Sequence, residues 1–196
     1  MALDQRRAPA RVSSRPPHGC LTGSRVSLEL AYLIVTGTTT APRAVELVHG
    51  LLELLPRVIT IPTPNAARVI SPRDLSTIPG NQLVESYFDA AILPRPPDGL
   101  VLVAPCSFNS LNKLAAGIAD NLALSLTAEA IGRGTPVVVA VSVNPPLWQH
   151  PRSAMSVATL RDWGVSVVEP SDTGEGLRLA PTHVILGEVA RRVNKS

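Results

Sequence analysis

Apolar and polar positions repeat with two different periods along most of the chain. Five short apolar runs have the length of β-strands, and apolar positions at helical spacing follow several of them. We expect β-strands at residues 31–35, 58–61, 100–104, 136–143 and 165–168. We expect helices at residues 45–55, 110–132, 153–163 and 182–193, the last of them capped by Thr182.

Two stretches interrupt this alternation. Residues 71–97 contain five prolines and little periodicity, which predicts a long excursion with one short helix. Residues 169–181 are rich in Gly, Pro, Ser and Asp, which predicts a mobile loop. Elsewhere strands and helices alternate, and residues 100–104 are apolar on both faces, as in a central parallel strand. The pattern predicts an α/β fold with three layers, Rossmann-like or flavodoxin-like, in which helices cover both faces of a parallel sheet.

Composition agrees with one such domain. The 196 residues suffice for a single core, and 45% hydrophobic against 17% charged residues argues against a disordered chain. We expect residues 28–196 to form the domain and residues 1–27 to be a disordered N-terminal extension.

No apolar run reaches the roughly 20 residues of a membrane helix, and the start of the chain lacks the apolar segment of a secretory signal. We therefore predict a cytoplasmic protein with no membrane partner. Cys20 and Cys106 do not make a disulfide framework.

The net charge of +3 comes from the extension. Residues 1–25 hold five arginines and one aspartate, which leaves 13 basic and 14 acidic residues for the rest. A nucleic-acid-binding domain would carry basic residues clustered on a folded face, and the sequence shows no such cluster. We predict neither a nucleic-acid partner nor a metal site.

Small and hydroxylated residues follow two of the predicted strands. In open parallel sheets, ligands bind outside the carboxyl ends of the strands, beside helix N-termini. Gly37, Thr38, Thr39 and Thr40 follow the first strand and could cradle a phosphate, although they lack the lysine of a P-loop and an ordinary strand-to-helix turn is an equal alternative. Thr63, after the second strand, is a weaker candidate.

The third strand ends in a longer polar run. Ser107, Asn109 and Ser110 begin the next predicted helix, and Asp120 and Asn121 lie side by side further along it. Asp and Asn are poor helix formers, so their presence within a helix needs an explanation. Ser107 or Asn109 as an N-cap and Asp120 as an exposed residue would each be a structural reason. The two departures on one helix together favour a ligand site.

These residues carry a family resemblance. The segment from Pro105 to Leu122 closely resembles the signature of the homo-oligomeric flavin-containing cysteine decarboxylases, which include phosphopantothenoylcysteine decarboxylase and enzymes acting on C-terminal cysteines of ribosomal peptides. Residues 105–110 match the family's Pro-Ala-Ser-Ala-Asn-Thr, and residues 117–122 are identical to its Gly-Ile-Ala-Asp-Asn-Leu. Residues 141–148 are a relaxed form of Pro-x-Met-Asn-x-x-Met-Trp that keeps Asn144 and Trp148. The resemblance covers about residues 30–181.

The resemblance implies an FMN cofactor and a homo-oligomer. In the family FMN lies between neighbouring subunits of a trimer, and in some members trimers assemble into a dodecamer. Asn144 would contact the substrate carboxylate or the flavin. The residues that would hold FMN are Gly37, Thr38 and Thr39 at the phosphate, with Thr63, Ser107, Asn109 and Ser110 nearby.

The sequence departs from the family at two places. The family has a histidine just before the third strand, and residues 85–93 contain none. His150, beside the Asn144 segment, is then the histidine to consider for chemistry, and Glu85, Tyr87 or Asp89 could also replace the missing base. Coenzyme A pathway members carry a cysteine in the mobile segment, where it reduces the enethiol to a saturated thiol, and residues 172–181 have none.

The resemblance and its departures together imply an enzyme that stops at the enethiol. FMN would oxidise a peptide's C-terminal cysteine to a thioaldehyde, from which CO₂ leaves to give an enethiolate, as in the formation of aminovinyl-cysteine. Asn144 and Arg178 would orient the carboxylate, and the thiol proton could pass to solvent. The alternative is an FMN-binding reductase or electron-transfer protein without decarboxylase activity. A flavin prenyltransferase and an interaction protein with an empty site are more distant alternatives.

Overall fold

A parallel six-stranded sheet organises the chain. The computed structural model describes residues 28–174 and 176–195. The strands are β1 (Leu30–Val35), β2 (Arg57–Pro62), β3 (Asn81–Leu83), β4 (Leu100–Cys106), β5 (Val137–Val141) and β6 (Ser166–Val168). Their order in the sheet is β3-β2-β1-β4-β5-β6, and every neighbouring pair is parallel. The predicted α/β fold with a parallel sheet is confirmed.

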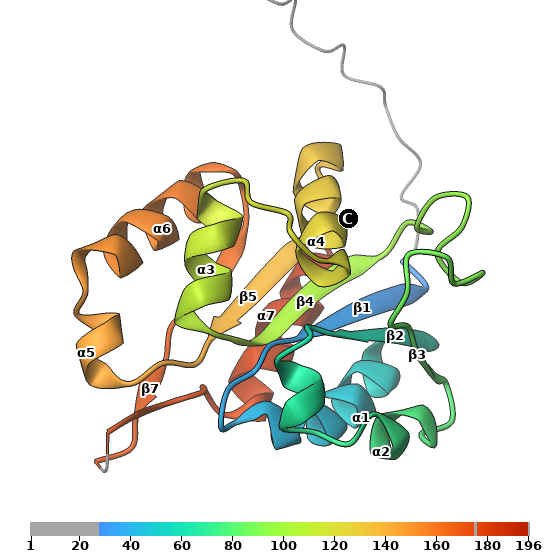
Figure 1. Ribbon diagram of the computed structural model, residues 1–196, viewed down its shortest axis with the longest axis horizontal. Coiled ribbons are helices and arrows are strands. Elements are labelled where there is room, and N and C mark those ends of the chain that lie inside the picture. The colour runs from blue at the N-terminus through green and yellow to red at the C-terminus, as the bar shows by residue number, and fades with distance from the viewer. Residues whose placement is uncertain (1–27, 175, 196) are drawn as a thin grey trace, which may run out of the picture.

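Helices cover both faces of this sheet (Figure 1). One face carries α1 (Ala44–Leu54), α2 (Pro72–Ser76) and α7 (Thr182–Val193), and the other carries α3 (Phe108–Ala115), α4 (Leu122–Arg133) and α6 (Pro151–Asp162). Along β1 the side chains alternate between the two faces. Leu33 packs into the core under α1, α2 and α7, and Ile34 packs into the core under α3, α4 and α6. A sheet buried on both faces accounts for the uninterrupted apolar runs of β1, β4 and β5.

Short elements complete the chain. Two 3-10 helices, η1 (Ala41–Arg43) and η2 (Ala66–Arg68), follow β1 and β2, and the short helix α5 (Pro145–Trp148) follows β5. Strands β7 (Ser171–Asp172) and β8 (Leu177–Arg178) form an antiparallel pair where a loop was predicted. In the part of the chain that the structure describes, no helix has the length and apolar character needed to cross a bilayer.

The structure corrects the prediction of one helix over residues 110–132. Two helices, α3 and α4, share this stretch. Between them Gly117 has φ +70°, and Asn121 is extended, with its side chain accepting a hydrogen bond from the backbone of Leu124 at 3.1 Å. Asn121 is therefore the N-cap of α4. Asp120 and Asn121 lie in a connecting loop, so their low helix propensity costs nothing there.

Two smaller expectations also change. The excursion over residues 71–97 contains the short helix α2, as predicted, but also the edge strand β3, whose polar sequence Asn-Gln-Leu gives little strand signal. Asn81 in β3 accepts a hydrogen bond from Thr60 and donates one to the Leu75 carbonyl. Thr182 does not cap α7: Pro181 occupies the N-cap position, and the Thr182 hydroxyl accepts a hydrogen bond from Arg43.

The strand order creates a switch point between β1 and β4. From β1 the chain moves outward to β2 and β3, and then returns to place β4 on the other side of β1. Connections leave the sheet in opposite directions at such a point, which opens a crevice at the carboxyl ends of the two strands. The sequence segments that follow β1 and β4 therefore meet there.

Candidate functional site

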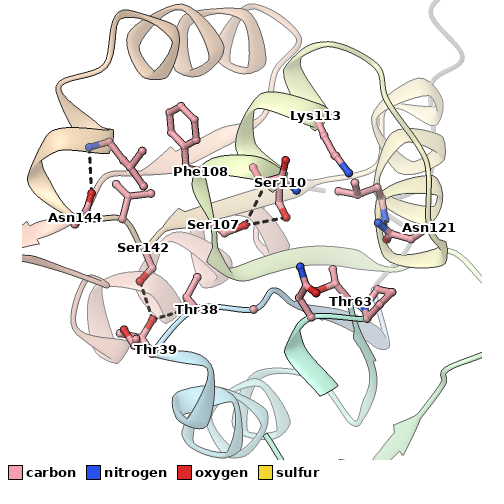
Figure 2. A pocket seen from close by; sticks show the side chains of 18 of the residues that line it. Thr38, Thr39, Thr63, Ser107, Phe108, Ser110, Lys113, Asn121, Ser142 and Asn144 are labelled. Atoms are coloured by element: carbon pink, nitrogen blue, oxygen red, sulfur yellow. Dashed lines mark hydrogen bonds between the residues drawn. The ribbon is translucent and has the colours of Figure 1, made fainter. Parts of the chain in front are cut away.

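A pocket of about 800 Å³ opens at the carboxyl ends of β1, β4 and β5. Figure 2 shows polar side chains from several separate segments pointing toward this space. Its volume lies within the roughly 300–1,000 Å³ typical of small-molecule sites. The lining residues are Gly37, Thr38, Thr39, Thr40, Thr63, Pro64, Asn65, Ser107, Phe108, Asn109, Ser110, Lys113, Asp120, Asn121, Leu124, Ser142, Val143, Asn144, Leu147, Leu177 and Arg178.

The loop after β1 forms the first wall. Thr36, at its start, is buried and joins this loop to the end of β4: its hydroxyl donates to the Pro105 carbonyl at 2.7 Å and accepts from the Ser107 backbone N–H at 2.8 Å. A Cβ on Gly37 would lie 2.7 Å from the Cβ and 2.8 Å from the carbonyl carbon of Asn65. Glycine therefore allows the loops after β1 and β2 to approach each other closely.

Hydroxyl groups connect this wall to the end of β5. The Thr38 and Thr40 hydroxyls are 3.0 Å apart, and the Thr40 hydroxyl lies 2.7 Å from that of Ser142. Thr40 and Ser142 are more than a hundred residues apart in sequence, so only the fold brings them together. The result is a row of hydroxyls along one side of the pocket.

The N-terminus of α3 forms the second wall. Ser107 is the N-cap, and its Oγ accepts from the Ser110 backbone N–H at 3.3 Å and donates to the Ser110 Oγ at 3.1 Å. The first backbone N–H groups of a helix lack intrahelical partners and carry a partial positive charge. With the hydroxyls of the first wall, they make this side of the pocket suited to an anionic or polar ligand.

Asn144 caps α5 at the third wall. Its Oδ1 accepts a hydrogen bond from the Leu147 backbone N–H at 3.1 Å (Figure 2). Using the oxygen as the cap leaves the two N–H donors of the amide for other partners. Asn144 thus combines a structural bond with donor groups at the pocket wall.

The charged residues of the lining are Lys113, Asp120 and Arg178. Lys113 and Asp120 form an ion pair between α3 and the loop that leads to α4. The hydrogen bond from Lys113 is the main cause that holds the pKa of Asp120 below its usual range. Arg178 enters from β8, so the pocket contains two cations and one anion.

Most residues predicted from the sequence meet in this pocket. Eight of them line it, namely Gly37, Thr38, Thr39, Thr63, Ser107, Asn109, Ser110 and Asn144. His150 does not. It is the N-cap of α6, where its Nδ1 accepts from the Arg152 backbone N–H at 3.1 Å and its ring packs edge-on against Phe108. Its position gives no support to the predicted chemical role.

The other candidate bases also lie outside the lining. None of Glu85, Tyr87 and Asp89 contributes to it; the Tyr87 hydroxyl bonds that of Ser125 at 2.8 Å on α4. No histidine of the described residues lines the pocket. Cys106 is fully buried at the end of β4 outside the lining, and burial raises the pKa of its thiol to about 12. The described residues include no group of His, Cys, Asp and Glu able to hold a metal ion.

Sequence reasoning missed several lining residues. Thr40 was recognised only as part of the loop, and Asn65, Lys113 and Ser142 received no role. Lys113 lies in the second turn of α3, three residues after Ser110, and this helical spacing was the one signal that could have placed it on the same face. No local signal distinguishes Asn65 or Ser142 from ordinary loop residues.

Comparisons with known proteins agree with this geometry. The Flavoprotein family model matches residues 25–194. The chain is 34% identical over 142 residues to the coenzyme A biosynthesis bifunctional protein CoaBC of Mycobacterium tuberculosis, covering 70% of this chain and 33% of that protein. It is 28% identical over 137 residues to a cysteine/cysteine sulfinic acid decarboxylase from an unknown prokaryotic organism, covering 60% and 36%. The chain thus spans about a third of the length of these relatives.

Solved structures share the fold. The epidermin biosynthesis protein EpiD from Staphylococcus aureus superposes with a TM-score of 0.70 at 18% identity, covering 82% of this chain and 99% of that chain. HAL3 from Cryptococcus neoformans gives a TM-score of 0.67 at 26% identity, covering 87% and 98%. Because the family model covers nearly the whole described domain, and the relatives share its fold, the chain belongs to the Flavoprotein family.

Proposed function

We propose that this chain is an FMN-dependent decarboxylase that converts the C-terminal cysteine of a peptide to an enethiol. One observation carries the proposal: three hydroxyl- and amide-bearing segments and the N-terminus of α3 converge on a single pocket at the switch point of a flavoprotein-family sheet. Solved relatives of the same fold are described as a peptidyl-cysteine decarboxylase and as FMN-dependent cysteine decarboxylases. Family membership and pocket chemistry point to the same cofactor.

The lining fits FMN in volume and chemistry. A phosphate requires donors without a competing carboxylate, and the loop after β1 offers the Thr38 and Thr39 hydroxyls beside Gly37, where a side chain has no room. Ser107, Asn109 and Ser110 add polar groups at the α3 N-terminus, and Thr63 lies opposite them. We assign these seven residues to FMN binding. When bound, FMN supplies a two-electron acceptor for the cysteine side chain.

The chain's own residues would orient the substrate. The amide N–H groups of Asn144 and the guanidinium of Arg178 are suited to a carboxylate, and both residues line the pocket. A cysteine thiol has a pKa near ~8.5, so a fraction is already thiolate at neutral pH and its proton can go to solvent without a histidine. The chemistry therefore needs donors that hold the carboxylate more than it needs a strong base.

The product would remain an enethiol. Reduction to a saturated thiol needs a reductant in the site, and the segment from β7 to the start of α7 contains no cysteine. Cys106 is buried outside the pocket lining with a raised pKa, so it is a poor replacement. This distinction favours a peptide substrate over the pantothenoylcysteine substrate of coenzyme A synthesis. We also propose a homo-oligomer, a trimer or an assembly of trimers, as the functional unit.

Two measurements on the purified full chain test the proposal. The absorption spectrum, before and after added FMN, reports whether flavin binds. Mass spectrometry of peptides ending in cysteine should then show loss of CO₂ plus two hydrogens, while matched peptides ending in serine or in cysteine amide stay unchanged.

The two stages separate the alternatives. Bound flavin with unaltered masses across a broad peptide library would favour the reductase or electron-transfer alternative, because the absence of a histidine from the described pocket lining is compatible with both functions. A colourless protein that takes up no flavin would refute the cofactor and the activity together.

A further inference from the structure

Arg43 links two walls of the pocket that are far apart in sequence. It ends η1, three residues after Thr40. Its Nη1 donates to the carbonyl oxygens of Leu179 at 3.1 Å and Ala180 at 3.0 Å, and its Nη2 donates to the Thr182 hydroxyl at 2.6 Å. One guanidinium therefore serves three acceptors: two carbonyls in the segment that joins β8 to α7, and a hydroxyl on the first residue of α7.

This segment depends on such a donor. Leu179 and Ala180 are 3% and 1% exposed, and their carbonyls lie in a connection outside the sheet and helix ladders. Buried carbonyls need hydrogen-bond partners, and Pro181, the next residue, has no N–H to offer. The planar fork of arginine can reach several acceptors at once, which a lysine ammonium does not match.

The acceptors lie directly beside pocket residues. Leu177 and Arg178 form β8 and line the pocket, and the bonded carbonyls are those of the two residues that follow. Thr182 adds a further connection, because its hydroxyl is the main cause that lowers the pKa of Glu46 on α1. The ion pair of Arg43 with Glu46 is an exposed i,i+3 contact with Nε and Oε2 3.4 Å apart, a type of pair that contributes little. The contacts to residues 179–182 are therefore the main interactions of Arg43.

We infer that Arg43 is a positioning residue that couples the loop after β1 to the wall formed by Leu177 and Arg178. Its backbone continues from the loop that holds Thr38 and Thr39, which we assign to the FMN phosphate, and its guanidinium fixes the substrate-facing strand. Ordering of the loop after β1 then favours ordering of the wall formed by Leu177 and Arg178, because both are connected to η1 through Arg43. The consequence for substrate binding rests on the proposed function; the structural coupling does not.

Hydrogen exchange of the full chain, followed by mass spectrometry, tests the coupling without any assay of activity. Arg43→Met keeps the length of the apolar stem and removes the donors. We expect the amides of residues 177–180 and 182 to exchange about tenfold faster, because the loop opens locally when its carbonyls lose their partners. Arg43→Lys should give an intermediate rate.

Arg192→Met is the matched control. Arg192 also anchors a loop from a helix, with Nε 2.6 Å from the Ser166 Oγ, but it lies away from the pocket lining. This variant should accelerate exchange around residues 164–168 and leave residues 177–182 unchanged. If Arg43→Met leaves exchange at 177–182 within twofold of wild type, or if the control raises it equally, the inference is wrong.

Two further measurements complete the test. Where Arg43→Met does not fold, Thr182→Val removes one acceptor and should raise exchange in the same segment by a smaller factor; an unchanged rate there contradicts the inference. If the chain decarboxylates peptides, Arg43→Met should raise KM about tenfold and change kcat less than twofold, because substrate positioning is affected and not the reacting groups. If wild type decarboxylates nothing, the proposed function fails while the exchange result still decides the coupling.

Discussion

Asn144 caps α5, and we propose that it also binds the substrate carboxylate; different substitutions can separate these two tasks. Its Oδ1 caps α5 through the Leu147 N–H, and its amide N–H groups are the donors that we assign to the substrate carboxylate. Aspartate is as good an N-cap as asparagine, but an ionised carboxylate has no N–H to donate. Asn144→Asp should therefore keep the fold of α5 and lose the contact with substrate.

The magnitudes follow from these two bonds. A hydrogen bond to a charged group contributes about 1.5–3 kcal/mol, so its loss should lower kcat/KM roughly 10- to 150-fold. Repulsion between the new carboxylate and that of the substrate acts in the same direction. The free energy of unfolding should change by less than about 0.5 kcal/mol, since the cap remains. Asn144→Ala removes both bonds and should in addition cost about 0.5–2 kcal/mol of stability.

Rates from mass spectrometry and denaturant unfolding curves, measured on the same preparations, provide the comparison. Asn144→Ser is the control, because serine keeps a capping oxygen without the amide and should resemble Asn144→Asp in stability while avoiding its negative charge. Wild-type kcat/KM in Asn144→Asp would show that the residue is only a cap. Equal destabilisation of the aspartate and alanine variants would refute the capping argument.

Two substitutions and two measurements on Cys106 test other parts of the structure. Gly37→Ala should weaken FMN binding at least about tenfold and lower stability by about 1–3 kcal/mol, as measured by flavin titration and thermal unfolding, because the new Cβ would meet Asn65 at 2.7 Å; unaltered FMN affinity would contradict the packing. His150→Ala should lose about 1 kcal/mol of stability with the α6 cap and leave the pH profile of kcat/KM unchanged, whereas an altered pH profile would show a chemical role. Cys106 should resist alkylation at about pH 8 until denaturant is added, because the thiolate is the reactive form and burial raises the thiol pKa to about 12. The folded protein holds this proton more tightly than the unfolded chain, so the free energy of unfolding should fall as pH rises from about 9 to about 12, and a flat profile there would contradict it.

The local sequence pattern gave a wrong prediction where helical spacing of apolar residues competed with a signal that ends a helix. The apolar positions of residues 110–132 continue at helical spacing across the break, yet Gly117 and the capping side chain of Asn121 end one helix and begin another. The polar strand β3 was missed for a different reason: at the sheet edge it is held to β2 by backbone pairing and by the bond between the Asn81 and Thr60 side chains. A pairing of this kind leaves no hydrophobic pattern to read.

The sequence by itself determined the α/β class and the position of most candidate ligand-site residues, because strand ends can be recognised from the length of a buried apolar run and all parallel strands end at the same edge; their link to a flavin came from the family resemblance. The tertiary structure decided which strand ends are neighbours, and so which side chains share a pocket. The bond between Thr40 and Ser142 spans 102 residues and that between Arg43 and Leu179 spans 136. His150 shows that closeness in sequence does not imply a shared site. It lies six residues from Asn144 in the chain, but its side chain caps the start of α6. Periodicity records whether a residue is buried, whereas a site depends on which distant residues the packing of the whole sheet brings within a few ångströms.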